Sequence, residues 1–482
     1  MNEQNISLKS ASKTMQFYYF CTLFNLNAHN WKDDSMKRLI LRTLTCIAIL
    51  TFPTVGWSQD DPSALQQAQG SGILHLTLDQ ALEIALSENN TIKIADMTIE
   101  KSGYAQKGSY ASLYPNVNIS GSYQRTLQKQ VMVMDMGGQA MEIKVGRDNN
   151  INTSASASMP LVNATLWESL KLSGMDVEMA VEQARSSKIA MVKQVKQAFY
   201  AVLLAQESHK VIGQVYENAQ KNYEKTLQRF NVGKASEVER LRAQVTMMNA
   251  EPNVSSAENA VLLATWQLKA VMGIDLGTEV EVVGDLNNYT AELLAPYVSE
   301  EDISNNSSLL QLDIQDRMLE STIKMQKNQY IPTLAASINY NYSAMGDDKL
   351  SWFPSSTAAL SLSVPVFDGF QKRYAIKQTK VSKNMLALQR LDTERNLRIA
   401  IRNYNDQMAL CIKNYQAANA TVSIAQKSYD ISEKMYEVGK ATMVELNDAQ
   451  VALMQAQLTE AQAIYNFMVT KASLDELIGK EE

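Results

Sequence analysis

Histidine, cysteine and proline are scarce in this sequence of 482 residues, which contains three histidines, three cysteines and nine prolines. So few histidines and cysteines leave little material for a metal centre, a thiol nucleophile or a disulfide framework. The sequence also lacks a nucleophile–base set and a phosphate-binding loop, so we expect no enzymatic activity, no cofactor and no bound metal. Its net charge of −6 is unfavourable for nucleic acid, which is not expected as a partner.

Residues 1–58 have the organisation of an upstream extension followed by a secretory signal peptide. A basic start at Met36 precedes a mostly apolar run over 39–55, and Gly56 and Ser58 supply the small residues of a cleavage site. The alternative is an N-terminal anchor helix, for which the run is short and mixed. Removal of residues 1–58 takes away six basic and three acidic residues, so the net charge falls from −6 to −9. No later apolar run is long enough for a transmembrane helix, so any membrane crossing must use strands.

The rest of the chain is an internal duplication. The segment Val232-Gly-Lys-Ala is repeated 206 residues later as Val438-Gly-Lys-Ala, and the paired prolines Pro115 and Pro332 precede similar segments. We therefore predict a first repeat over 59–273, a connector over 274–301 and a second repeat over 302–482. The segment from Pro115 to Pro160 in the first repeat is 12 residues longer than the segment from Pro332 to Pro365 in the second, which indicates one longer loop.

Each repeat contains a pair of segments in which apolar and small polar residues alternate. The pairs span 115–160 and 332–367, and prolines bracket them. A period of two over eight to ten residues predicts strands with one apolar and one polar face. In the longer loop, methionines flank Gly137-Gly138; we interpret this as an extracellular hairpin tip, with a soft-metal contact as the alternative.

The other segments carry a seven-residue apolar repeat that predicts very long helices packed against neighbours. One such helix is expected over 166–231, and return helices are expected over 236–273 and 441–478. Gly233 and Gly439 suit left-handed caps at the ends of the long helices. Pro252 predicts a kink in the first return helix. The two apolar columns in the first repeat are 191, 198, 205, 212, 219 and 195, 202, 209, 216, 223, 230; in the second they are 397, 404, 411, 418, 425 and 401, 408, 415, 422, 429, 436.

Four amphipathic strands cannot be stable alone in a bilayer, because both outer edges would lack hydrogen-bond partners. Three chains would supply 12 strands, enough for a water-filled lumen, whereas the eight strands of two chains would be filled by side chains. We therefore favour a trimer. The alternative is a soluble β-hairpin domain with stalk helices.

The sequence resembles a known family, the TolC-like outer-membrane efflux proteins. The resemblance covers nearly the whole mature chain and rests on the opening segment Leu78-Asp-Gln-Ala-Leu-Glu-Ile-Ala-Leu, on Pro115 and Pro332 with their following strands, on Leu362-Ser-Val-Pro-Val-Phe-Asp-Gly, and on the two Val-Gly-Lys turns. It implies a mixed α and β membrane protein: a trimeric 12-stranded transmembrane β-barrel, with four strands per chain, continued by a long periplasmic α-helical barrel.

The function implied by this resemblance is an exit duct of a tripartite efflux or type I secretion system. Such a protein lies in the outer membrane, contacts its lipid and extends into the periplasm as a homotrimer. Its implied partners are a periplasmic adaptor (membrane fusion) protein and an inner-membrane transporter. The rival interpretations are a periplasmic adaptor and an envelope coiled coil without a pore; two hairpins, each preceded by a strand pair, count against both.

The resemblance also implies functional residues at the periplasmic tips. Read onto this sequence, the acidic pore constriction falls on Glu445 and Asp448, which are three apart and hence on one helix face. A ring of such carboxylates favours cations; the alternative is a pair of ordinary solvated side chains. The first repeat has Glu239 at the matching position but Arg242 in place of the aspartate. Our candidates for adaptor docking are the two turns, which could instead be plain helix caps: Val232, Gly233, Lys234, Val438, Gly439 and Lys440.

Overall fold

The computed structural model describes residues 74–136, 139–294 and 302–481. They belong to one compact unit that spans residues 72–482. The predicted signal peptide and the Gly137-Gly138 turn lie outside the described residues. No helix within the described ranges is both long and apolar enough to cross a membrane.

Two helices dominate each half of the chain, as the seven-residue repeat predicts. The long helices are α5 (Ala164–Asn231, 68 residues) and α9 (Gln371–Glu437, 67 residues). At ~1.5 Å per residue each spans about 100 Å. The return helices are α6 (Glu237–Met272), which continues through Pro252, and α10 (Met443–Ile478). Every residue of the predicted apolar columns is buried or half-buried, which confirms the helix faces.

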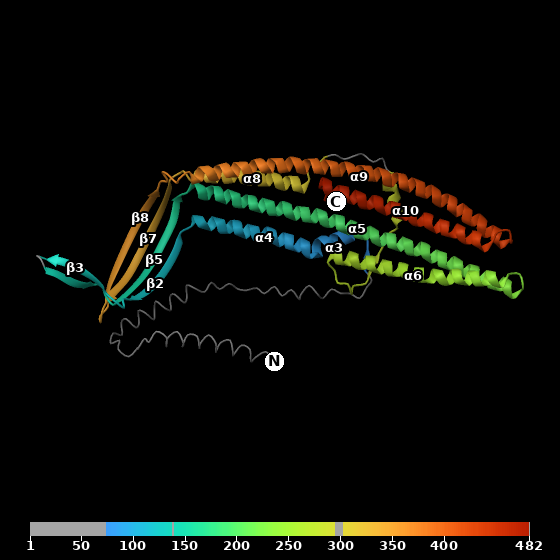
Figure 1. Cartoon of the computed structure of the whole chain (residues 1–482), viewed down its shortest axis with the longest axis horizontal. Helices are drawn as coiled ribbons and strands as arrows, with labels where there is room; N and C mark the ends of the chain where they lie inside the picture. Colours follow the sequence, from blue (N-terminus) through green and yellow to red (C-terminus); the bar gives the residue numbers. More distant parts are fainter. Residues whose placement is uncertain (1–73, 137–138, 295–301, 482) are drawn as a thin grey trace. The chain divides into compact units, whose positions relative to one another are not determined.

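Four strands form one antiparallel sheet at the end of the long helices opposite to the helical tips (Figure 1). They are β2 (Asn116–Arg125), β5 (Asn149–Val162), β7 (Thr333–Gly346) and β8 (Ser351–Ser363), in the order β2-β5-β7-β8. These strands confirm the two predicted pairs. One detail differs: Pro160 lies inside β5 and does not end it, because the register shifts between Pro160 and Val162. Such a bulge accommodates a residue without an N–H group.

The register of this sheet separates apolar from polar side chains almost completely. Val117, Ala157, Ile338 and Ala358 lie opposite one another on one face, and Asn118, Ser156, Asn339 and Thr357 lie on the other. The apolar face is exposed in the single chain; Ile119 and Leu360, for example, are each 73% exposed. A contiguous exposed apolar surface of this kind marks an interaction with lipid or protein.

The longer loop of the first repeat is a hairpin, as expected. It consists of β3 (Gln130–Met136) and β4 (Gln139–Val145), which pair with each other and with no other strand in the described part of the chain. Asp347, in the loop between β7 and β8, fixes its base: Lys129 Nζ lies 2.9 Å from Asp347 Oδ1, and Arg147 Nη1 lies 2.9 Å from Asp347 Oδ2. The Asp148 N–H donates to the same carboxylate at 2.9 Å.

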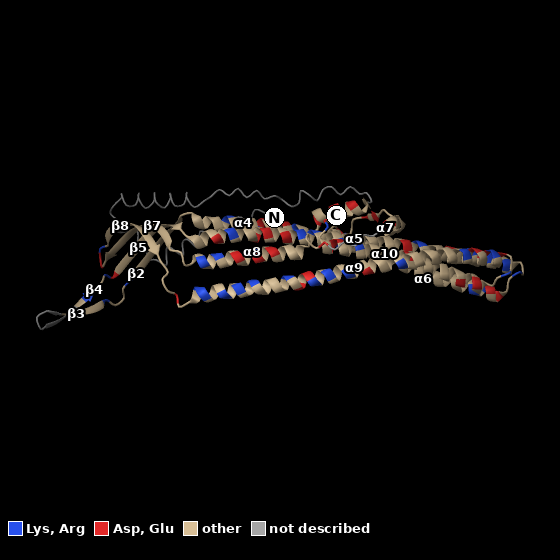
Figure 2. Ribbon diagram, turned by 90° about the horizontal axis from the view of Figure 1, so that it is seen from above, with Lys and Arg blue, Asp and Glu red and all other residues tan. Residues whose placement is uncertain are grey.

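The helices next to the sheet repeat its order. These are α4 (Asn90–Tyr110), α5, α8 (Ser307–Asn328) and α9, with contacts between α4 and α5, α5 and α8, and α8 and α9 (Figure 1; Figure 2). Toward the tips the order of contacting helices becomes α6-α5-α10-α9. Exposed ion pairs join α8 to both of its neighbours, Arg317 to Glu178 of α5 at 2.7 Å and Asp313 to Arg390 of α9 at 2.8 Å.

The connector carries regular structure of its own. It contains β6 (Val280–Val282), the short 3₁₀ segment η4 (Leu286–Tyr289) and α7 (Thr290–Leu294). β6 pairs in parallel with β1 (Leu74–Leu76), which precedes α3 (Leu78–Glu88). Together with α5, α6 and α10 these elements enclose the main core, whose fully buried members include Leu76, Phe199, Leu268, Leu286, Leu293 and Ile464.

Candidate functional site at the helical tips

The two tips have the same backbone geometry. The Gly233 N–H donates to Phe230 O at 2.8 Å and the Lys234 N–H donates to Arg229 O at 2.7 Å. The second tip repeats this pattern around Gly439, whose φ is +75°, against +71° for Gly233. Paired bonds of this type with a left-handed glycine form a Schellman cap. The predicted caps are therefore confirmed.

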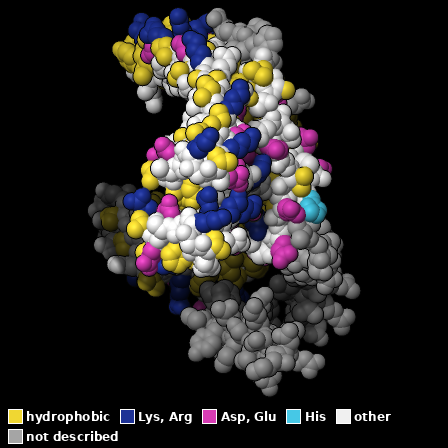
Figure 3. All heavy atoms as spheres, turned by 90° about the vertical axis from the view of Figure 1, so that its right-hand side faces the viewer, with side chains coloured by type: hydrophobic (Ala, Val, Ile, Leu, Met, Phe, Trp, Pro, Cys, Tyr) yellow, Lys and Arg dark blue, Asp and Glu magenta, His cyan; other side chains and the backbone are white. Residues whose placement is uncertain are grey.

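The exposed surface of the tips combines apolar and basic groups. Val232 is 67% exposed and Val438 is 69% exposed, and each glycine is followed by an exposed lysine, Lys234 or Lys440. Figure 3, which faces the tip end, shows hydrophobic side chains among Lys and Arg side chains. A surface of this composition is suited to protein contacts.

A hollow of about 540 Å³ lies between the two tips. It brings Val232 and Lys234 of the first tip together with Glu433, Tyr436 and Glu437 of α9; Asn222, Lys225, Gln228 and Arg229 complete its lining. The three candidates of the second turn, residues 438–440, are not among the lining residues.

Direct bonds join the two hairpins at this point. Lys225 Nζ lies 2.8 Å from Glu437 Oε1, and the Thr226 and Tyr436 hydroxyls lie 3.1 Å apart in a buried position. The Arg229 guanidinium lies 5.7 Å from the centre of the Tyr436 ring. The hydrogen bond from Lys225 lowers the pKa of Glu437, and the same bond raises the pKa of Lys225. The sequence predicts that Tyr436 lies in an apolar column of its helix, but its pattern does not indicate the contact with Thr226 of the other hairpin.

Glu445 has a structural role in the single chain. The Thr442 N–H donates to Glu445 Oε2 at 2.7 Å, while the Glu445 N–H donates to Thr442 Oγ1 at 3.3 Å, which completes a capping box at the start of α10. The bond from the Thr442 N–H, together with a bond of 3.1 Å from the Thr442 hydroxyl to the same carboxylate oxygen, lowers the pKa of Glu445. Ser236 and Glu239 form the same box at the start of α6. The match between Glu239 and Glu445 therefore has a common structural cause.

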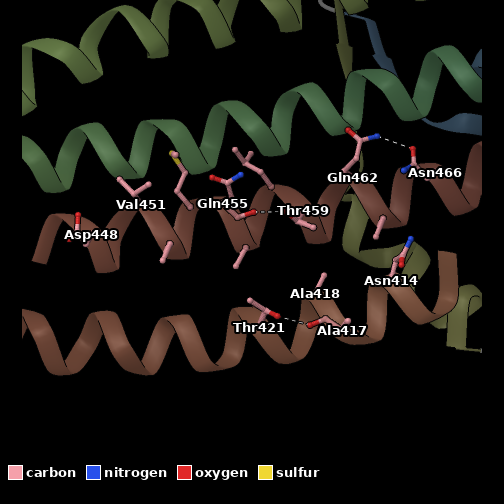
Figure 4. A pocket seen from close by; sticks show the side chains of 15 residues that line it. Asn414, Ala417, Ala418, Thr421, Asp448, Val451, Gln455, Thr459, Gln462 and Asn466 are labelled. Atoms are coloured by element: carbon pink, nitrogen blue, oxygen red, sulfur yellow. Dashed lines mark hydrogen bonds between the residues drawn. The ribbon is translucent and has the colours of Figure 1, made fainter. Parts of the chain in front are cut away.

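Asp448 lies at one end of a long groove between α9 and α10 (Figure 4). On α10 the groove is lined by one helix face that includes Gln455, Thr459, Gln462 and Asn466, and Asp448 is the only charged residue in the lining. The groove has a volume of about 1010 Å³. Both Glu445 and Asp448 are exposed, as the constriction hypothesis requires, and Arg242 of the first repeat is exposed as well.

Comparison with known proteins identifies the family. The family model described as "Outer membrane efflux protein" matches residues 81–274 and 298–480. Outer membrane protein TolC of Escherichia coli is 24% identical over 360 residues, which cover 69% of this chain and 71% of that protein. The cobalt-zinc-cadmium resistance protein CzcC of Cupriavidus metallidurans is 22% identical over 456 residues, 92% of this chain and all of that protein.

A solved structure agrees with the fold. The CmeC outer membrane channel of Campylobacter jejuni superposes with a TM-score of 0.66 at 15% identity, covering 83% of this chain and 85% of that one. The matched family confirms the predicted mixed helix-and-strand fold and the predicted efflux function at the outer membrane, and it does not favour the adaptor alternative. The chain belongs to the outer membrane efflux protein family.

Proposed function

We propose that three copies of this chain form one continuous exit duct, which a periplasmic adaptor opens at the helical tips and an inner-membrane transporter supplies. One observation carries this proposal. The sheet and the helices beside it have the same order, and among the described residues both orders end in elements that have no neighbour on one side.

The open edges of the sheet are β2 and β8. Because each neighbouring pair is antiparallel, β2 and β8 run in opposite directions. A β8 strand of one copy can therefore continue the antiparallel pattern with β2 of the next. Unpaired edges are not tolerated in lipid, which supports closure by further copies. Three copies give 12 strands around a water-filled lumen.

The open edges of the helical layer expose apolar side chains at helical spacing. Ile94, Met97 and Tyr104 are exposed on α4, and Tyr374, Val381, Met385 and Leu388 are exposed on α9. α4 leads into β2 and α9 follows β8, so strands and helices would meet a neighbouring copy along one seam. Burial of these side chains would stabilise the assembly by about 25 cal/mol per Å² of apolar surface.

The polar face of the sheet would then line the lumen, and the apolar face would contact outer-membrane lipid. At the other end, Glu445 and Asp448 from three copies would form the acidic constriction. The exposed Val-Gly-Lys turns at 232–234 and 438–440 would present the docking surface for the adaptor. Opening would be a two-state change in helix packing near the tips.

Cysteine cross-linking across the seam tests the trimer. In a Cys411→Ala background, Val117→Cys on β2 is combined in turn with cysteine at Ala358, Leu360 and Leu362 on β8, which scans the stagger between copies. A bifunctional maleimide should give covalent products up to three chains. Val117→Cys with Ala157→Cys, which face each other within one chain, is the control and should give a monomeric product. Products that stop at two chains or extend beyond three would contradict the proposal.

A further inference from the structure

Exposed aromatic side chains mark all four junctions between the sheet and the helices. Tyr114 precedes β2, Trp167 follows β5, Tyr330 precedes β7 and Phe367 follows β8; all four are exposed. Aromatic residues are favoured at the membrane–water interface, because an aromatic ring can contact the hydrocarbon while its edge lies among the polar head groups.

Taken together, the same junctions carry a net positive charge, most of it on residues 364–380, although the chain as a whole is acidic. Residues 104–116, 162–173, 320–332 and 364–380 together contain eight Lys or Arg residues and three Asp or Glu residues. In the ribbon of Figure 2, Lys and Arg positions recur along α9 and at the end of α8 nearest the sheet. We call these four segments the basic collar.

Cations and rings are in contact within the basic collar. Lys372 Nζ lies 5.2 Å from the centre of the Tyr330 ring, and Lys377 Nζ lies 5.9 Å from that of Tyr374. Lys107 Nζ lies 5.2 Å from the Tyr104 ring. Long cationic side chains beside exposed rings are typical of the membrane–water interface, where the stem stays apolar and the charge reaches the head groups.

Three cations of the collar are available to a ligand. Arg373, Lys377 and Lys380 are spaced four and three apart on one face of α9, and all three are exposed. None of them forms an ion pair with a carboxylate in the described part of the chain, whereas Lys383 on the face toward α8 pairs with Asp316 at 3.2 Å.

We propose that Arg373, Lys377 and Lys380 bind the head groups of anionic phospholipids in the periplasmic leaflet of the outer membrane. This inference rests on the proposed function, which places the apolar face of the sheet in lipid and the helices in the periplasm. The collar adjoins the sheet, because only seven residues separate the end of β8 from the start of α9. Its positive charge complements phosphate, and the rings beside it favour the interface over a water-filled lumen.

A lipid-binding measurement on the full processed chain in detergent tests this proposal. The variant is Arg373→Gln with Lys377→Gln and Lys380→Gln. Its matched control, Arg402→Gln with Lys413→Gln and Lys427→Gln, removes the same charges from exposed positions of α9 farther from the sheet. Binding of phosphatidylglycerol and of phosphatidylcholine is titrated by native mass spectrometry. We expect the wild type and the control to prefer phosphatidylglycerol, and the collar variant to bind it at least about tenfold more weakly.

Two further readouts separate the possible failures. Preference for phosphatidylglycerol should weaken as salt is raised, since exposed charges are screened. An unchanged preference for phosphatidylglycerol in the collar variant would overturn the proposal. A change in the ion selectivity of the channel with lipid binding unaffected would overturn it as well, because Arg373, Lys377 and Lys380 would then face the lumen. If the wild-type chain fails to insert into vesicles and conduct ions, the proposed function itself fails.

Discussion

At the scale of the residue, Glu445 serves a backbone role that is separable from its charge. Its carboxylate accepts the Thr442 N–H, and glutamine can do the same in a capping box. Asp448 makes no such bond; it is the single charge at the end of a groove lined by small, amide and apolar side chains. The two residues therefore call for different substitutions.

We expect Glu445→Gln with Asp448→Asn to make the channel less selective for cations while the cap of α10 is kept. The reason is that three copies would lose six carboxylates around one opening. Ion selectivity in planar bilayers measures this effect. Glu239→Gln, the equivalent change at the start of α6, is the control and should leave selectivity unchanged. If both variants behave as the wild type does, the acidic constriction lies elsewhere.

Thr442→Ala tests the cap itself. It removes the hydroxyl that accepts the Glu445 N–H, so we expect the start of α10 to lose about 1 kcal/mol of stability. Hydrogen exchange of the amides of residues 443–446 should increase. Thr442→Ser, which keeps the hydroxyl, should restore protection.

At the scale of the element, two bonds hold the hairpins together near the tips. The buried hydrogen bond between Thr226 and Tyr436 and the exposed ion pair between Lys225 and Glu437 both join α5 to α9. Of the two, the buried bond should matter more, since exposed ion pairs contribute little and are screened by salt.

Tyr436→Phe should therefore loosen the tip by about 1 kcal/mol, the net value of a typical hydrogen bond. We expect a larger single-channel conductance or more frequent opening, because the two hairpins would separate more easily. Tyr429→Phe is the control, since Tyr429 packs in the same apolar cluster of the tip. A Tyr436→Phe channel that stays closed as often as the Tyr429→Phe channel would show that this bond does not limit opening.

The β3–β4 hairpin depends on one carboxylate. The hydrogen bond from Lys129, together with those from the Asp148 N–H and Arg147, holds the pKa of Asp347 far below its ordinary value of 3.8. A lowered pKa means that the stabilisation is complete above the ordinary value and is lost only as the pH falls through the lowered one. The base of the hairpin should thus be unaffected between pH 7 and pH 4.

Asp347→Asn should release the hairpin, because it removes the charge that pairs with Lys129 and Arg147. A spin label on Val133 should become more mobile at pH 7, and in the wild type its mobility should be the same at pH 7 and pH 4. Asp348→Asn, a change at the exposed neighbouring residue, should have no effect. Loosening of the wild-type hairpin near pH 5 would contradict the assignment.

At the scale of the whole molecule, a charged side chain should have opposite effects on membrane insertion when it is introduced on the two faces of the sheet. Ala155 lies on the apolar face, opposite Ile119 and Tyr340, whereas Ser154 lies on the polar face, opposite Ser120 and Asn341. Ala155→Arg should destabilise the proposed membrane-inserted barrel by about 2–4 kcal/mol per copy. Ser154→Arg should insert normally and alter conductance. Folding yield in vesicles distinguishes the two, and equal yields would mean that the apolar face does not contact lipid.

Much of the fold could be predicted because its signals are local. The alternation along Leu334, Ala336 and Ile338 predicts which side of a strand is apolar. The seven-residue spacing of Val195 and Val202 predicts the apolar face of a helix. Gly233 and Gly439 report the ends of helices, since a left-handed φ is strained for other residues. The parallel pair of β1 and β6 could not be predicted from the sequence, because strands of three residues are too short to show a period.

The sequence by itself determined the strand faces, the helix faces and the capped turns, because each depends on residues only a few positions apart. Only the tertiary structure decided which edges stay open, and that Lys225 meets Glu437, 212 residues away. That contact depends on the register of α5 against α9, and the register is set by the packing of the whole core. No pattern within either helix carries that information.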